Sequence, residues 1–195
     1  MLISKFDNTG IAKEIELFEQ KYNFIFPEVY RNFLLKYNGG ETPKSKFKIK
    51  KISSDIRAFY GFGYADEHYH FDKIQKNNYF NEWMQEGVMP IAANVFGDYV
   101  MIGINNSNKG KIYFFYHDRP NKYIELSEDL EAFMSKCKSE KIGHIQTIEE
   151  RKQKLINNGN KKNITPALIK IWKEQINEYA NMHQEEIVLD KGVLQ

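Results

Sequence analysis

The chain has 195 residues, with 28 Lys and Arg against 26 Asp and Glu, so its net charge of +2 argues against a direct nucleic-acid partner and against an acidic mimic of nucleic acid. The single cysteine excludes an intrachain disulfide and a multi-thiolate metal site. No apolar run approaches the ~20 residues that a membrane span needs, so we expect a soluble, cytoplasmic protein without a membrane partner.

Two amphipathic helices are predicted near the N-terminus. Apolar residues recur at helical spacing from Ile11 to Tyr22. A second helix begins at Pro27, whose missing N–H costs nothing in a first turn, and its apolar stripe runs to Tyr37. Gly39 is expected to supply the left-handed exit. The two helices should pack as a pair.

Four segments read as strands of one antiparallel sheet, and we expect the last two to be central. Lysines alternate with apolar residues in the first, which favours a protected edge strand, with a phosphate-binding stripe as the alternative. Between the first two lies an aromatic and glycine-rich stretch, residues 58–64, that predicts a strand with a tight bend. The four segments are Phe47 to Lys51, Met89 to Ala92, Tyr99 to Ile104 and Lys111 to Tyr116.

Two further helices are expected around these strands. One runs from Asp72, its cap, to Trp83, although Asn77 and Asn78 weaken it. The other is capped by Ser127 and runs over residues 128–138. Its apolar face includes Cys137, which we interpret as a core thiol rather than a nucleophile.

The C-terminal part predicts a helical hairpin. Thr147 and Glu150 form a capping box, and Thr165-Pro166 starts a second helix with a broad apolar stripe over residues 168–179. This stripe is interpreted as packing on the domain's own flank, with a homodimer or partner contact as the alternative. We therefore expect a domain over residues 1–140 and a helical extension over residues 141–195.

Three segments in order resemble one family. They are Tyr22 to Gly40 (YNFIFPEVYRNFLLKYNGG), Met89 to Ile102 with its Phe-Gly-Asp-Tyr, and Gly110 to Asp118 with its Gly-Lys-Ile-Tyr. Together they resemble the SUKH family of fungal cell-wall-synthesis regulators and bacterial immunity proteins, over roughly residues 10–138. Tyr or Phe stands where the family often has tryptophan in its last strand, and residues after 140 have no counterpart. The resemblance implies an α+β fold with an antiparallel central sheet flanked by helices, here followed by a C-terminal helical hairpin extension.

The resemblance also implies a function in protein binding rather than catalysis. Such a protein binds and neutralises a cognate polymorphic toxin, typically a nuclease, in the cell that produces it. Richness in Lys, Asn, Ile, Tyr and Phe is typical of an AT-rich genome and favours a bacterial source. The alternative is a regulatory interaction module like the fungal members, with the helical hairpin as a docking element.

No catalytic signature or cofactor motif occurs, so we expect neither an enzyme nor a cofactor. His68, His70 and Asp72 form at most a fragment of a metal site, and surface histidines are the favoured interpretation. His117-Asp118 could act as a general base in an enzyme of unrecognised type, but a strand-end pair with local hydrogen bonds is favoured. We expect no bound metal.

The candidate partner-binding residues are aromatics next to acids, because rigid aromatic anchors ringed by charge suit a tight protein interface. The opposing interpretation is that the aromatics are core residues and the acids are merely solvated. A cationic nuclease cleft would attract these acids and repel the lysine-rich strand. The candidates are Tyr60, Tyr64, Asp66, Glu67, Asp98 and Tyr99.

Overall fold

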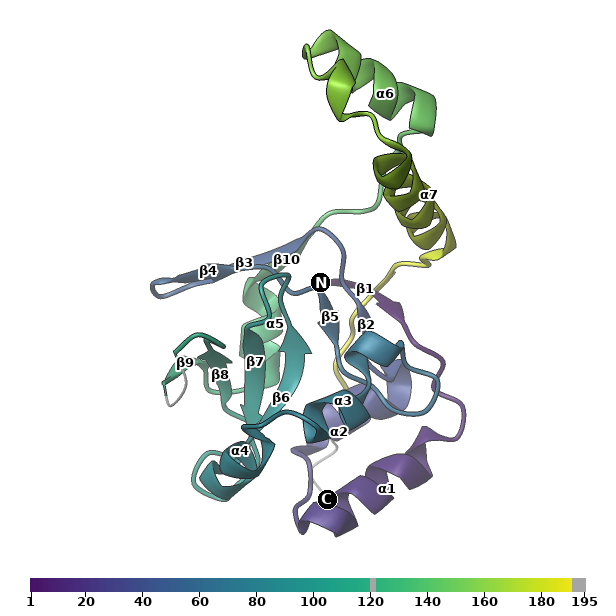
Figure 1. Ribbon diagram of the computed structural model, residues 1–195. Helices are drawn as coiled ribbons and strands as arrows, with labels where there is room; N and C mark the ends of the chain where they lie inside the picture. Colours follow the sequence, from purple (N-terminus) through teal and green to yellow (C-terminus); the bar gives the residue numbers. More distant parts are fainter. Residues whose placement is uncertain (120–121, 191–195) are drawn as a thin grey trace. The chain divides into compact units, whose positions relative to one another are not determined.

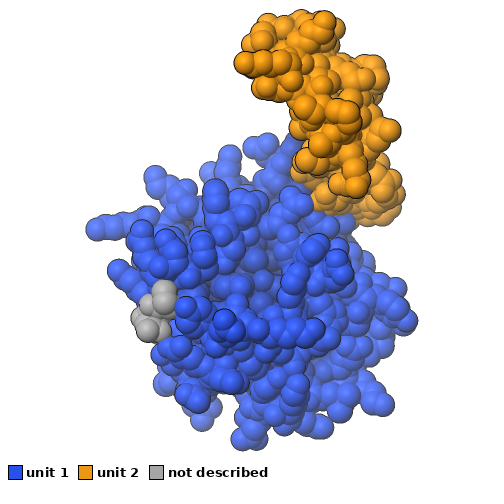
Figure 2. Space-filling view, in the orientation of Figure 1, with its two compact units in different colours: residues 1–140, 185–195 blue, residues 141–184 orange. Residues whose placement is uncertain are grey.

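The computed structural model describes residues 1–119 and 122–190, and the chain divides into two compact units (Figure 2). The sheet unit comprises Met1–Glu140 together with the segment that begins at Glu185. The helical unit comprises Lys141–Gln184. The segment from Glu185 thus rejoins the sheet unit instead of continuing the extension expected over residues 141–195, of which residues 191–195 lie outside the described part.

An eight-stranded sheet forms the centre of the sheet unit, in the order β11-β1-β2-β5-β6-β7-β8-β9. Neighbouring strands of this sheet pair antiparallel, and Figure 1 shows β6, β7 and β8 side by side. The α+β class with an antiparallel sheet is therefore confirmed. The strands are β1 (Leu2–Lys5), β2 (Gly40–Glu41), β5 (Ala58–Phe59), β6 (Val88–Ala93), β7 (Tyr99–Gly103), β8 (Ile112–Phe115), β9 (Tyr123–Ser127) and β11 (Glu185–Glu186).

The lysine-rich segment does not belong to this sheet. It forms β3 (Ser45–Ile49), which lies between β4 (Ile52–Ser54) and β10 (Cys137–Ser139) in a separate three-stranded sheet. The edge-strand interpretation was therefore wrong. The alternation itself was informative, because Lys46 and Lys48 are exposed while Ser45, Phe47 and Ile49 are buried. No local pattern predicted the partner strand β10, which follows directly after a helix.

The predicted N-terminal helices are present as α1 (Ile11–Tyr22) and α2 (Glu28–Tyr37). The left-handed exit from α2 begins one residue earlier than expected, at Asn38 with φ 52°, before Gly39 with φ 73°. Asparagine tolerates this conformation better than most residues. The fully buried Asn38 side chain also has a structural role, because it bonds to the backbone of distant residues.

Two other helices differ from their expected bounds. The segment expected as one helix from Asp72 to Trp83 is broken into α3 (Phe71–Gln75) and α4 (Phe80–Glu86). Asn77 Oδ1 accepts a bond from the Tyr79 amide at 2.9 Å between them, so the side chain competes with the helix. Next, α5 (Leu130–Lys136) is capped by Asp129, because Ser127 is the last residue of β9.

The core of the sheet unit is rich in aromatic rings. The ring centroid of Phe33 in α2 lies 5.2 Å from that of Phe59 in β5, and the ring centroids of Phe18 in α1 and Phe71 are 5.5 Å apart. Cys137 is buried beside this core at the start of β10, and burial raises the pKa of its thiol to about 12. The interpretation as a buried thiol is confirmed.

The helical unit contains α6 (Ile148–Asn157) and α7 (Pro166–Asn181), joined through a short 3-10 turn, η2 (Lys161–Asn163). The capping box of Thr147 and Glu150 and the Thr165 cap are confirmed. Arg151 donates to Gln175 at 2.9 Å between the helices, and the Ile142 amide donates to Gln184 at 2.7 Å at their base. None of the residues of this unit is buried.

Candidate protein-binding surface

The aromatic and glycine-rich stretch divides between the core and the surface. Tyr60 is only 5 % exposed, and its ring lies 5.9 Å from that of Phe71. Burial raises the pKa of its hydroxyl above the usual range. Tyr60 is therefore a core residue and does not offer the contact area expected of it. Tyr64, in contrast, is 73 % exposed.

Buried hydrogen bonds hold the loop that carries Tyr64. Asn38 accepts from the Phe62 amide at 2.8 Å and donates to the Phe62 carbonyl at 2.8 Å. It also donates to the carbonyl of Asp7 at 2.6 Å. On the other side, the Gly63 amide donates to Glu14 of α1 at 3.0 Å. The backbone around Tyr64 is thus shaped before any partner arrives.

Close contacts between backbone segments at Gly61 also fix this loop. Gly61 donates to the Tyr69 carbonyl at 2.9 Å and accepts from the Phe71 amide at 3.0 Å. A Cβ at Gly61 would collide with the carbonyl oxygen of Asn38, so only glycine fits. The glycines between the aromatics therefore permit close packing rather than phosphate binding.

Asp66 and Glu67 follow Tyr64 and are both exposed. Asp66 accepts from the His68 amide at 2.8 Å and so caps η1 (Glu67–Tyr69), a short 3-10 helix. The Glu67 side chain is 86 % exposed and lies 3.6 Å from the His68 ring. Tyr64, Asp66 and Glu67 thus lie together on one fixed loop, which we call the loop surface.

Two hollows of about 250 and 460 Å³ adjoin the loop surface and share His70 and Asp72 in their linings. The smaller lies against α1 and includes Leu17 and Lys21, and the larger includes Glu67. Both hollows are lined by acids and lysines, so the region has mixed charge. Such a surface can orient a partner through individual charge pairs.

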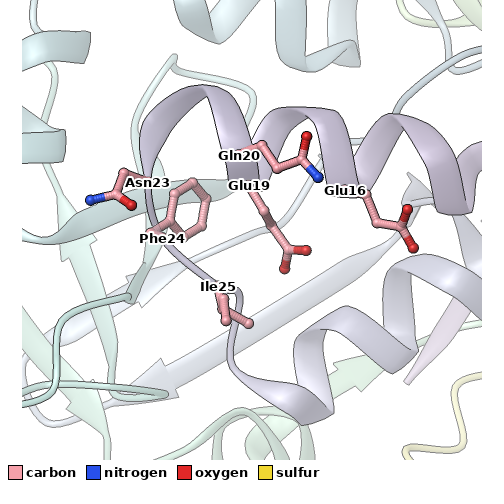
Figure 3. A pocket seen from close by; sticks show the side chains of 6 residues that line it. All are labelled: Glu16, Glu19, Gln20, Asn23, Phe24 and Ile25. Carbon is pink, nitrogen blue, oxygen red and sulfur yellow. The ribbon is translucent and has the colours of Figure 1, made fainter.

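A third hollow of about 470 Å³ lies between the end of α1 and the chain that leads to α2 (Figure 3). Glu19 points into the space between them, but its two oxygens face the Phe26 amide at 2.9 Å and Arg31 at 3.3 Å. The carboxylate that could bind a cation therefore ties α1 to α2 instead. Ile25 at the rim is largely exposed.

A family model matches residues 12–136, and its description is the SMI1 / KNR4 family (SUKH-1). The match covers more than half of the chain. This protein belongs to the SUKH-1 family. The resemblance seen in the sequence is thereby confirmed, and the SUKH domain is in general a protein-binding domain without enzymatic activity. A search of curated proteins gave no match.

The SUKH-1 match covers the candidates Asp98 and Tyr99; Asp98 directly precedes β7, and Tyr99 is the first residue of that strand. Asp98 is buried and bonds to Asn94 and His117. Tyr99 is half-buried, its ring lies 5.3 Å from Trp83, and burial raises its pKa. We therefore do not include either residue in the loop surface, because the Asp98 carboxylate is hydrogen-bonded and the Tyr99 ring packs within the domain.

Histidines of this SUKH-1 chain take part in local hydrogen bonds. His70 accepts from the Asp72 amide at 3.1 Å and caps α3, and His68 lies 3.0 Å from Lys73 Nζ. Asp98, His117 and Asp118 have potential metal-ligating atoms within 4.8 Å of one another among the described residues. Asp98 Oδ1, however, already accepts from the His117 amide and faces His117 Nδ1 at 2.8 Å.

Sequence reasoning missed the exposed apolar pair Val95 and Phe96. Both lie in the turn between two strands that had been predicted, and Asn94, Gly97 and Asp98 are turn formers. That combination was the available signal. Among the described residues, no helix is both long and apolar enough to cross a membrane.

Proposed function

We propose that this protein is an immunity protein, which binds and neutralises a cognate nuclease toxin in the cytoplasm of the bacterial cell that produces it. Membership of the SUKH-1 family supports a protein-binding role. The observation that carries the proposal is the loop surface, where exposed Tyr64 stands beside two carboxylates on a backbone fixed by buried hydrogen bonds. The protein acts by binding, without turnover, cofactor or metal.

A preformed surface suits this task for a physical reason. An inhibitor loses less conformational entropy on binding when its contact loop is already ordered. A tyrosine supplies a large contact area at a small entropic cost, because it has few rotatable bonds. Asp66 and Glu67 complement the cations that line a nuclease cleft. The loop surface combines these three properties.

Charge is divided unequally between the units. The helical unit holds eight Lys and Arg against four Asp and Glu, an excess of four positive charges. The remaining residues therefore hold 20 basic and 22 acidic side chains. A toxin with a cationic cleft should therefore bind to the sheet unit rather than to the helical unit.

The experiment measures binding to the toxin domain encoded beside this gene, by calorimetry and by rescue of growth. Asp66→Lys with Glu67→Lys should raise the Kd about tenfold or more, and Tyr64→Ala should also weaken binding. The melting temperature of Tyr64→Ala and of Glu67→Lys should not change, because both side chains are exposed, whereas Asp66→Lys also loses the cap of η1, so its folding is checked by the same melt. The matched control is Lys46→Gln with Lys48→Gln, which should bind like the parent. The opposite ranking would place the contact elsewhere.

A second candidate function is a regulatory interaction module with the helical unit as its docking element. Ile171 is 49 % exposed and Ile156 is 40 % exposed, so α6 and α7 leave apolar side chains open to solvent. A toxin gene directly beside this one favours immunity, and its absence favours regulation. Sedimentation velocity tests the predicted homodimer through these helices, which their shared positive charge opposes.

A further inference from the structure

Two neighbouring apolar side chains project from the turn between β6 and β7. Val95 is 59 % exposed and Phe96 is 73 % exposed. Single exposed apolar residues are common on protein surfaces. An adjacent pair at the end of a strand turn is less so, because it puts a contiguous apolar area into water. We call Val95 and Phe96 the turn tip.

A buried polar network fixes the shape of the turn tip. The side-chain oxygen of Asn94 accepts from the amides of Phe96 at 2.9 Å and Asp98 at 2.8 Å. Its side-chain nitrogen donates to Asp98 at 3.0 Å and to Ser54 at 3.0 Å. Asn94 and Asp98 are both buried. The apolar pair is therefore presented by a braced turn and not by a loose loop.

The same network reaches the chain after β8 and the chain after β4. Asp98 accepts from the His117 amide at 3.1 Å, and the Val95 amide donates to Asp55 at 3.3 Å. Two other segments of the sheet unit, Ser54-Asp55 and His117, thus hold this one turn. A side chain on such a support loses little conformational freedom when a partner covers it.

Three carboxylates lie near the turn tip, and one of them, Asp98, is buried. Asp55 bonds to its backbone, Asp98 lies beneath it, and Asp118 follows His117 with a side chain that is 60 % exposed. Arg119 pairs with Asp118 at 3.9 Å and lies over the ring of Tyr116. Phosphate groups of lipids or nucleic acids would be repelled by these carboxylates, whereas basic protein side chains would be attracted.

We propose that Val95 and Phe96 anchor a protein partner, by insertion into an apolar pocket of that partner with basic side chains at its rim. The inference rests on the proposed function and adds to it a second contact with the same toxin, formed by the turn tip. The aromatic ring supplies the buried area, and the acids around it fix the orientation. Asp98 positions this contact from inside the fold.

Calorimetry with the purified toxin domain encoded beside this gene tests the inference. Phe96→Ser should raise the Kd about 30-fold or more, and Val95→Ser should raise it less. Val188→Ser is the matched control, because Val188 is 56 % exposed elsewhere on the sheet unit, and it should bind like the parent. Unchanged melting temperatures show that the variants are folded.

Gly97→Ala tests the bracing separately from the apolar contact. Gly97 has φ 88°, and a Cβ there would meet no heavy atom within 4 Å, so the substitution strains the backbone without a clash. It should weaken toxin binding several-fold while Val95 and Phe96 remain present. Binding equal to that of the parent would contradict a role for the fixed turn.

The outcomes separate the inference from the proposed function. If Phe96→Ser binds as tightly as the parent while Asp66→Lys with Glu67→Lys binds weakly, the proposed role of the turn tip is contradicted and the immunity function stands. If the parent protein does not bind the toxin, both are overturned. Loss of self-association in Phe96→Ser, measured by sedimentation, would show that the turn tip binds a second copy of this chain. Binding of the parent to phosphatidylserine-containing vesicles would show that it binds a membrane. Either result would overturn the inference.

Discussion

Helices α2 and α7 have similar local sequence signals but different surroundings. Each starts at a proline and has an apolar stripe at helical spacing. In α2 the stripe is buried against the sheet unit, whereas α7 has no buried residue. The comparison teaches that an apolar stripe predicts a helix but does not predict that the stripe is covered. Coverage depends on tertiary packing that the spacing does not encode.

The largest expected effect comes from emptying the core of the sheet unit. Phe33→Ala and Phe114→Ala should each lower the free energy of unfolding by about 3–5 kcal/mol, because both rings are buried and leave cavities. Trp172→Ala in α7 should leave the main thermal transition within a few degrees of the parent. Thermal melts provide the measurement, and a large loss in Trp172→Ala would show that the helical unit supports the core.

The next effect is at the exit from α2. Asn38→Ala should cost about 2–4 kcal/mol, because it leaves buried backbone groups of Phe62 unpaired and puts alanine in a left-handed conformation. Denaturant unfolding measures the loss. Asn158→Ala, at the end of α6, is the control on an exposed residue and should change stability by less than about 0.5 kcal/mol.

A smaller effect is expected in the helical unit. Thr147→Ala removes the capping-box bond to the Glu150 amide and should destabilise α6 by about 1 kcal/mol. Hydrogen exchange should report faster exchange in α6 while the amides of β7 are unchanged. A change in β7 would show that the two units unfold together.

The smallest effect concerns the chemistry of Cys137. Its pKa of about 12 keeps the thiol protonated at pH 8, so alkylation of the folded protein should be much slower than in denaturant. Because the folded pKa is raised above the ordinary value of about 8.5, its contribution to stability is complete below that pH and declines as pH rises toward 12. Thiol titration with and without denaturant checks this.

Much of the fold was predictable because its signals are local. The spacing from Ile11 to Tyr22 predicted the bounds of α1, and the capping box of Thr147 with the proline start at Pro166 located the helical hairpin. The separate three-stranded sheet was not predictable. Its pairing joins Phe47 to Cys137, which are far apart in the chain, and no local pattern records which strands meet.

The candidate surface was predictable only in part, for a related reason. Tyr60 and Tyr64 look alike in the sequence, yet one is buried and the other is exposed because the chain turns between them at Gly63, which has φ 56°. Asp98 looks like a surface acid beside an aromatic, but its carboxylate is buried and hydrogen-bonded to Asn94 and His117. Residue type indicated the kind of chemistry, and only the tertiary contacts determined which groups remain free.

The insertion of the helical unit between β10 and β11 has a mechanical consequence. β10 ends in the three-stranded sheet, and β11 lies at the edge of the eight-stranded sheet. Tension applied to α6 or α7 would therefore load both sheets. β11 pairs with β1 at two positions, Leu2↔Glu186 and Ile3↔Glu185, against three between β10 and β3, and both its residues are exposed, so it should separate first. Its departure would bare the edge of β1, where an extended segment of another chain could then pair.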